Sequence, residues 1–312
     1  MGTGYLQVKT STSDYIPVKS KITVIHNGDI LHTIETDENG ITENIALEAP
    51  PKEQSLDPDF EGVPYSTYNV KADTLGFASS YIHGVQIFDT ITSVLAITML
   101  PESDSPLTNE HIVPMHQVHS PSQSTMCKPG VYPSEVIIPQ FITPHPDKPQ
   151  IPFIDYIKKA ASQHAYPTWP ESAIEATIYA IASLAHCNTH VWENPEHTQV
   201  FSNISEMVDL VYNRYIMHDD SPFFAEFSDG RHNTCPGLWQ WGAVKLAERG
   251  HDALEILRHY YPADIQLVET HNFQAQEPED MQKQKTGGNS FEKLLTMLIA
   301  SRIIESCRTE YL

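Results

Sequence analysis

A proline-dense stretch near the middle of the chain is the feature that most constrains its fold. Ten of the 23 prolines fall between residues 101 and 150. Proline has no backbone N–H and fixes φ, so this density opposes both a helix and a central strand. We therefore predict an extended, proline-rich linker over residues 103–150, which separates two parts of the chain with different patterns.

The part before the linker favours short strands. Residues 6–10 and 21–25 alternate in polarity or are rich in β-branched side chains. Asn27-Gly28 is a strong signal for a hairpin turn, and Asp37 to Gly40 indicates a second turn. These spacings predict an antiparallel β-sandwich over residues 1–102.

The part after the linker favours helices. Apolar residues recur at helical spacing in residues 171–186, from Ile204 to Tyr215, and in residues 241–248. Asp252 and Glu255 have the spacing of a capping box at the start of a further helix. We predict a mainly α-helical domain over residues 151–270. A polar spacer and one amphipathic helix should follow over residues 271–312, so the fold class is multidomain α and β.

Charge and composition exclude several classes of partner. The chain has 40 acidic and 19 basic residues and a formal net charge of -21, which opposes binding to nucleic acid or to anionic membranes. No apolar run is long enough for a membrane span, and the N-terminus lacks the pattern of a signal peptide. The four cysteines are far apart, so we expect no disulfide framework.

Glu171 is the candidate acid of the chain. It follows Trp169 and Pro170 at the predicted start of a helix. A glycosidic bond is cleaved by a carboxylic acid that protonates the leaving oxygen, and an aromatic neighbour helps a carboxyl to keep its proton. The alternative is a capping box formed by Thr168 and Glu171. Spacing alone favours the cap, although the two roles are compatible.

A polar loop over residues 229–237 is the second candidate. His232 and Cys235 could bind zinc or form a nucleophile pair, but no third ligand or orienting group is evident, so we predict no metal. The aromatic residues Trp239, Trp241 and Tyr260 could stack on sugar rings or fill a core, and their helical spacing favours the core.

Three blocks of the second part resemble the SpoIID/LytB family of peptidoglycan lytic enzymes. Residues 235–243 (CPGLWQWGA) are similar to that family's C-x-G-x-S-Q-x-G-A block, and residues 257–262 (LRHYYP) to its I-L-x-Y-Y segment. Residues 166–171 (YPTWPE) resemble its W-P-E opening. In the first part, residues 36–40 (TDENG) and 64–70 (PYSTYNV) resemble the pro-region of clostridial spore cortex-lytic enzymes.

The resemblance implies a lytic transglycosylase that acts on spore cortex peptidoglycan, with Glu171 as general acid and base. It implies that substrate is also contacted by Trp169, His232, Gln240, Trp241 and Tyr260. It further implies a precursor that an activating protease cuts in the proline-rich span, a location in the spore cortex or coat region, and no cofactor.

Four departures from the family pattern keep an alternative open. Trp239 replaces a small polar residue, Glu175 replaces a basic one, and Ser228 stands where close relatives often have cysteine. No recognisable wall-binding module follows Thr270. The alternative is a catalytically inactive homologue that binds cell-wall or spore peptidoglycan.

Overall fold

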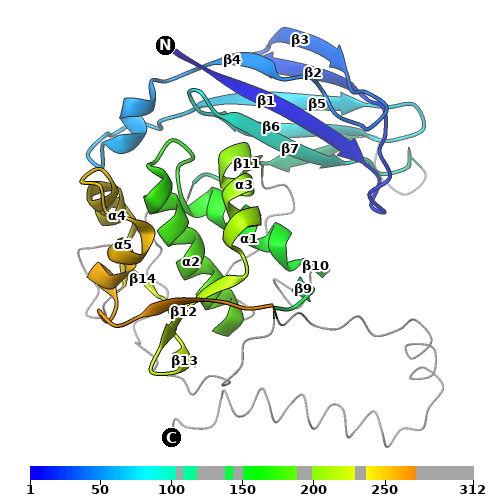
Figure 1. Cartoon of the computed structure of the whole chain (residues 1–312). Coiled ribbons are helices and arrows are strands. Elements are labelled where there is room, and N and C mark those ends of the chain that lie inside the picture. Colours follow the sequence, from blue (N-terminus) through cyan, green and yellow to red (C-terminus); the bar gives the residue numbers. More distant parts are fainter. Residues whose placement is uncertain are drawn as a thin grey trace, which may run out of the picture.

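A β-sandwich packs on a layer of helices in this protein (Figure 1). The structure, a computed structural model, describes residues 1–102, 108–116, 118, 138–142, 150–187, 199–228 and 237–271. The sandwich is built from two sheets, and the helices lie against one end of it, with several small sheets around them.

The first sheet has the strand order β11-β7-β1-β4. Its strands are β1 (Gly2–Ser11), β4 (Ile45–Ala49), β7 (Thr92–Thr98) and β11 (Val200–Phe201). Strand β1 pairs antiparallel with β4 but parallel with β7, while β11 adds antiparallel to the free edge of β7. The sheet therefore contains a strand from the helical part of the chain.

The second sheet has the order β3-β2-β5-β6-β8. Its strands are β2 (Lys21–His26), β3 (Asp29–Glu35), β5 (Ser66–Asp73), β6 (Ser79–Ile87) and β8 (Thr108–Ile112). All neighbours are antiparallel except β6 and β8, which are parallel.

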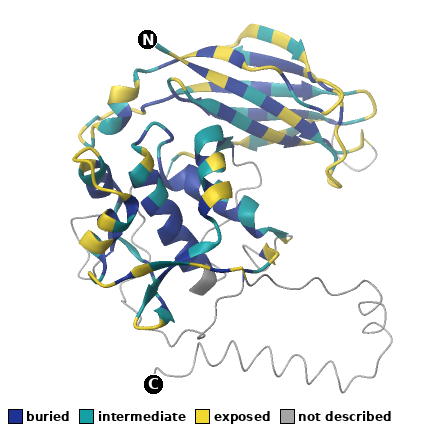
Figure 2. Ribbon diagram, viewed as in Figure 1, coloured by how far each residue is buried: buried dark blue, intermediate teal, exposed yellow. Residues whose placement is uncertain are grey.

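Alternating polarity drives the two sheets together, because every second side chain of a strand faces the same side. Leu6 and Val8 of β1 are fully buried and share a core with Val70 of β5 and Ile82 of β6. The resulting stripes of buried and exposed residues are visible along the strands in Figure 2.

Local turn signals are confirmed in the sandwich. Asn27 and Gly28 both have positive φ (52° and 91°) in the turn between β2 and β3, as a two-residue hairpin requires. The second turn closes through the Asp37 side chain, which accepts hydrogen bonds from the backbone N–H groups of Asn39 and Ile41. Gly40 supplies the positive φ (71°) that the turn needs.

Helix α2 is the centre of the second part. It contacts each of the other four helices that the structure describes. Its apolar residues are buried on nearly all sides, from Ala173 to Ala185, which is expected of a helix enclosed by others. The helices are α1 (Phe153–His164), α2 (Glu171–Cys187), α3 (Ser202–Val211), α4 (Gln240–Ala247) and α5 (Ala253–Tyr260). The predicted capping box of Asp252 and Glu255 is confirmed at the start of α5.

The prediction of a mainly α-helical domain after the linker is wrong. Strands run between and beside the helices, and across the described residues more of the chain lies in strands than in helices. Tyr215, predicted at the end of a helix, lies in a strand, because α3 ends at Val211 and the chain turns back to pair with residues 266–269. The strands are β9 (Phe141–Ile142), β10 (Ile151–Pro152), β12 (Arg214–His218), β13 (Ser221–Pro222), β14 (Phe227–Ser228), β15 (Leu238–Trp239) and β16 (Gln266–Glu269).

The proline-rich span is also more than an extended linker. It contributes β8, which completes an edge of the second sheet, and β9, which pairs with β10. Strand β8 contains no proline, and its parallel pairing with β6 joins residues far apart in sequence, so composition could not reveal it. The domain boundaries at residues 102, 150 and 270 stay predictions. The predicted helix near the C-terminus lies outside the described residues.

The core of the helices includes two residues from the first part of the chain. Tyr65 and Phe88 belong to the same buried cluster as the residues of α1 and α2. A short 3-10 helix, η1 (Lys52–Leu56), leads from β4 toward the start of α2. The contacts of η1 fix the segment that carries the candidate acid.

Candidate functional site

Glu171 lies in the first turn of α2 and is exposed. Its helix begins after Pro170, whose carbonyl accepts hydrogen bonds from the backbone N–H groups of Ala173 and Ile174. Within the described residues, no hydrogen bond or ion pair involves the Glu171 carboxylate. The side chain is thus free to meet a ligand.

The alternative role for Glu171, a capping box with Thr168, is wrong. The helix starts at Glu171 itself, three residues after Thr168, so Thr168 is not the cap residue. The Thr168 hydroxyl instead lies 2.6 Å from the hydroxyl of Ser55, a hydrogen-bond distance, in η1 of the sandwich part.

Trp169 fixes the loop that leads into Glu171. Its indole N–H donates to the carbonyl oxygen of Ser55 at 2.8 Å. Its ring meets those of Tyr166 and Trp241 edge to face, with centroids 5.4 Å and 5.2 Å apart. Only 4% of Trp169 is exposed, so the residue stabilises the loop through buried contacts.

The described part of the block that resembles the family signature, residues 237–243, packs against the same loop through Trp241. Gln240 begins α4, is buried, and donates from Nε2 to the carbonyl oxygen of His164 at the end of α1. Trp241 is buried beside Trp169. Gly242 leaves room for the Tyr260 hydroxyl, because a Cβ at this position would collide with it.

The structure thus brings Trp169, Gln240 and Trp241 together under the helix start that bears Glu171. Tyr260 of α5 lies beside them and is half-buried. This partial burial raises the pKa of its phenol to about 12. The roles of these residues as substrate contacts stay predictions. His232 and Cys235 lie outside the described residues.

The strands that flank the polar loop lie side by side. Ser228 of β14 is paired with Trp239 of β15 in a short parallel ladder. Just before β14, the backbone carbonyl of Glu226 accepts hydrogen bonds from the N–H of Leu238 and the hydroxyl of Tyr261. Burial raises the pKa of the Glu226 carboxyl, which helps it keep a proton. Sequence reasoning missed this acid.

Glu175 has a partner that the sequence did not suggest. The phenol of Tyr179 donates to Glu175 Oε1 at 2.7 Å, one helical turn away. Arg214 of β12 reaches the Tyr179 oxygen at 3.5 Å and pairs with Glu269 at 3.5 Å. Burial raises the pKa of Tyr179 to about 12, and the Glu175 carboxylate adds to this shift. The phenol therefore stays protonated and orients Glu175.

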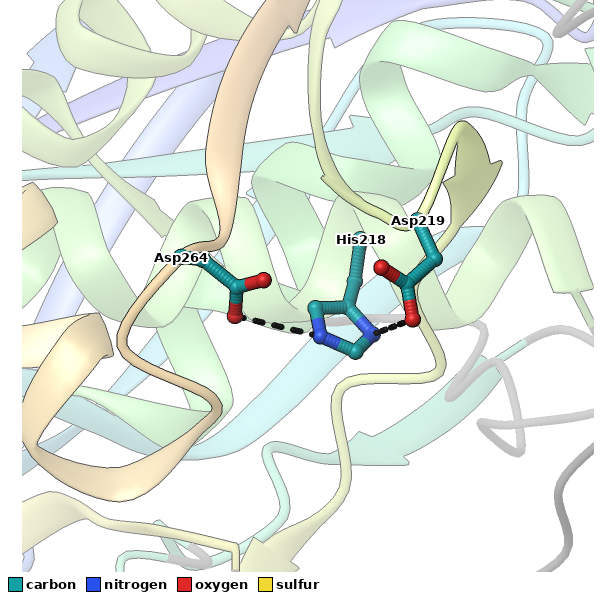
Figure 3. A group of neighbouring side chains, drawn as sticks. All are labelled: His218, Asp219 and Asp264. Carbon is teal, nitrogen blue, oxygen red and sulfur yellow. Dashed lines mark ion pairs between the residues drawn. The ribbon is translucent and has the colours of Figure 1, made fainter.

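A group of one histidine and two aspartates is also evident (Figure 3). His218 lies between Asp219 and Asp264, with Nδ1 3.5 Å from one carboxylate and Nε2 3.2 Å from the other. One ligand atom from each residue lies within 4.8 Å of the others. The carboxylates face different ring nitrogens, however, and do not converge on one point as metal ligands do. This arrangement is that of a histidine which pairs with two carboxylates when it is protonated.

Among the described residues, no helix combines the length and apolar composition that a membrane crossing requires. Comparison with protein-family models and with curated proteins finds no significant match to the chain.

Proposed function

We propose that the chain is a peptidoglycan lytic transglycosylase that cleaves the glycan strands of spore cortex, with Glu171 as general acid and base. The observation that supports this best is the exposed carboxylate of Glu171, which has no hydrogen-bond or ion-pair partner among the described residues and begins a helix just after two residues, Thr168 and Trp169, that contact Ser55. A catalytic group must be held in place by a rigid surrounding. The resemblance of three sequence blocks to SpoIID/LytB enzymes supports the same reaction.

The proposed reaction needs one carboxyl group in two successive roles. Protonated Glu171 first gives its proton to the glycosidic oxygen as the bond from that oxygen to the muramic C1 breaks. The resulting carboxylate then takes the proton from the C6 hydroxyl of the same sugar, and the C6 oxygen bonds to C1. The products are a free hydroxyl end and a 1,6-anhydro end, no water is consumed, and Glu171 is again protonated.

The proposal includes maturation and location. The chain is made as a precursor, a protease activates it by cutting within residues 103–150, and it works at the spore cortex. Trp169, Gln240 and Trp241 shape the site by packing, while His232 and Tyr260 contact the glycan.

The test is product analysis on isolated cortex peptidoglycan or decoated spores. The full chain, before and after limited proteolysis, is incubated with the substrate, and released fragments are identified by mass spectrometry. We expect 1,6-anhydro ends. Glu171→Gln should lower their yield about 100-fold or more, since general acid–base groups contribute at least that factor. Glu206→Gln, an exposed acid on α3, is the matched control.

Three results would contradict parts of the proposal. Full activity of Glu171→Gln would remove that residue from catalysis, and loss of activity only in Glu226→Gln would move the acid to Glu226. A folded protein that binds peptidoglycan without forming 1,6-anhydro ends would favour the inactive wall-binding homologue.

A further inference from the structure

We propose that the N-terminal region (residues 1–118) stays bound to the C-terminal region (residues 138–271) as a noncovalent subunit when the chain is cut between them. The inference rests on the contacts between the two regions. It does not depend on whether the protein is an enzyme.

The first contact is a shared sheet. Strand β11 of the C-terminal region pairs with β7 of the N-terminal region, with Val200 opposite Val94 and Phe201 opposite Ser93. The other edge of β7 is paired with β1, so β11 occupies the edge that remains. Addition of a strand to an open edge is a common mode of peptide binding.

The second contact is an exchange of hydrogen bonds between two buried glutamines. The backbone N–H of Gln86 donates to the side-chain oxygen of Gln199 at 2.7 Å. The side-chain N–H of Gln199 donates to the backbone carbonyl of Gln86 at 2.6 Å. Both residues are only 2% exposed. Separation of the regions would expose these groups to water or leave them buried without a hydrogen-bond partner, and a buried polar group without a partner is costly.

The third contact holds the loop before Glu171. Ser55 lies in the N-terminal region, and Thr168 and Trp169 lie in the C-terminal region. Their two contacts, at 2.6 Å and 2.8 Å, cross the boundary between the regions, and Ser55 is fully buried. The N-terminal region therefore supplies part of the support of the candidate acid.

Aromatic rings fill the space between these polar contacts. Phe88 of the N-terminal region meets Phe201 edge to face at 5.2 Å and Tyr166 at 5.6 Å. His116 of the N-terminal region lies 5.0 Å from Tyr166 and 5.6 Å from Phe201. This is the packing of a domain core, as in stable protein interfaces.

A cut between the regions would leave all of these contacts in place. Val118, at the end of the N-terminal region, is 3% exposed, and Ile138, at the start of the C-terminal region, is 2% exposed. None of the contacts above involves a residue between them. The two regions should therefore remain associated after cleavage.

The test uses the full chain, folded before it is cut. A recognition sequence for a site-specific protease is inserted at one point within residues 119–137, without removing any residue. The purified protein is then cleaved completely. Gel filtration with light scattering is then run over a dilution series, with uncut protein as reference. We expect both fragments to elute together at the mass of the intact 35.1 kDa chain plus the insert. Separate elution of the two fragments would overturn the proposal.

A variant of the interface makes the test specific. Gln199→Ala should raise the dissociation constant of the cut complex about tenfold or more, which corresponds to about 1.4 kcal/mol. Glu206→Gln, on an exposed face of the same region, should leave it unchanged. Equal dissociation constants for the two variants would contradict the assigned interface. If Gln199→Ala does not fold, Trp169→Phe, which removes one hydrogen bond across the interface, takes its place with the same two outcomes.

Discussion

At the scale of the residue, His116 shows what burial does to a titratable group. It lies among aromatic rings, donates from its Nδ1–H to Gln86 Oε1 at 2.6 Å, and its Nε2 is shielded from solvent. Burial lowers the pKa of His116 to about 3. The folded protein therefore keeps this imidazole neutral, while the unfolded chain takes up a proton below about pH 6.5.

Stability should consequently fall as the pH falls. Because the unfolded state binds the extra proton, the contribution of His116 is fully present above about pH 6.5 and is lost on the way down to pH 3, by at most about 1.4 kcal/mol per pH unit. Urea unfolding at pH 7, 6 and 5 measures this. In His116→Phe the free energy of unfolding should decline less steeply as the pH falls. His259→Asn, at an exposed position, should show the same decline as the unchanged protein. Equal slopes in all three proteins would contradict the prediction.

Trp169 offers a second residue-scale prediction. Trp169→Phe keeps most of the apolar ring but removes the indole N–H, which leaves the buried carbonyl of Ser55 without its donor. We expect a loss of about 1–3 kcal/mol in the free energy of unfolding, the usual cost of a stranded buried polar group. Denaturant titration checks it. Trp239→Phe, whose partly exposed ring lies under Lys245, is the control and should cost less.

At the scale of the element, α4 and α5 pack through a glycine. A methyl group at residue 242 would collide with the hydroxyl of Tyr260 and with the ring of Trp239. Gly242→Ala should therefore destabilise the protein by about 1–3 kcal/mol, although alanine is the better helix former. Tyr260→Phe removes the nearest atom of the collision, so the double variant should recover part of the loss. Denaturant unfolding of the two single variants and the double variant gives the coupling energy, and purely additive effects would contradict the close packing.

The elements that could be predicted from sequence are those whose signals are local. The turn at Asn27-Gly28 and the capping box of Asp252 and Glu255 depend on residues within one turn of each other, and both are confirmed. The Thr168 cap also looked local, but its hydroxyl is paired with Ser55, 113 residues away. For the same reason no local pattern could reveal the parallel pairing of β1 with β7. The sequence favours a partly buried Glu171 beside Trp169, but in the structure Glu171 is exposed and only Trp169 is buried. The burial of Trp169 depends on its contact with Ser55, more than 100 residues away, which no local pattern could reveal.

At the scale of the whole molecule, the two regions should unfold together. Tyr65 and Phe88 of the N-terminal region belong to the core of the helices, and the two regions share a sheet through β11. All four tryptophans lie after residue 150, so tryptophan fluorescence reports on the C-terminal region, while far-ultraviolet circular dichroism also reports on the sandwich. We expect the two signals to give one coincident urea transition. Separate midpoints would indicate that each region is stable alone.

The position of β11 also bears on the order in which the protein is synthesised. Strand β7 leaves the ribosome roughly 100 residues before its neighbour β11, a delay of about 5 to 20 s at ordinary rates of translation. During that time the edge of the nascent sheet at β7 is open, and an open edge can pair with other chains. The sandwich therefore cannot close its first sheet as an early, independent folding step, and a nascent chain stalled between residues 98 and 200 presents an aggregation-prone edge.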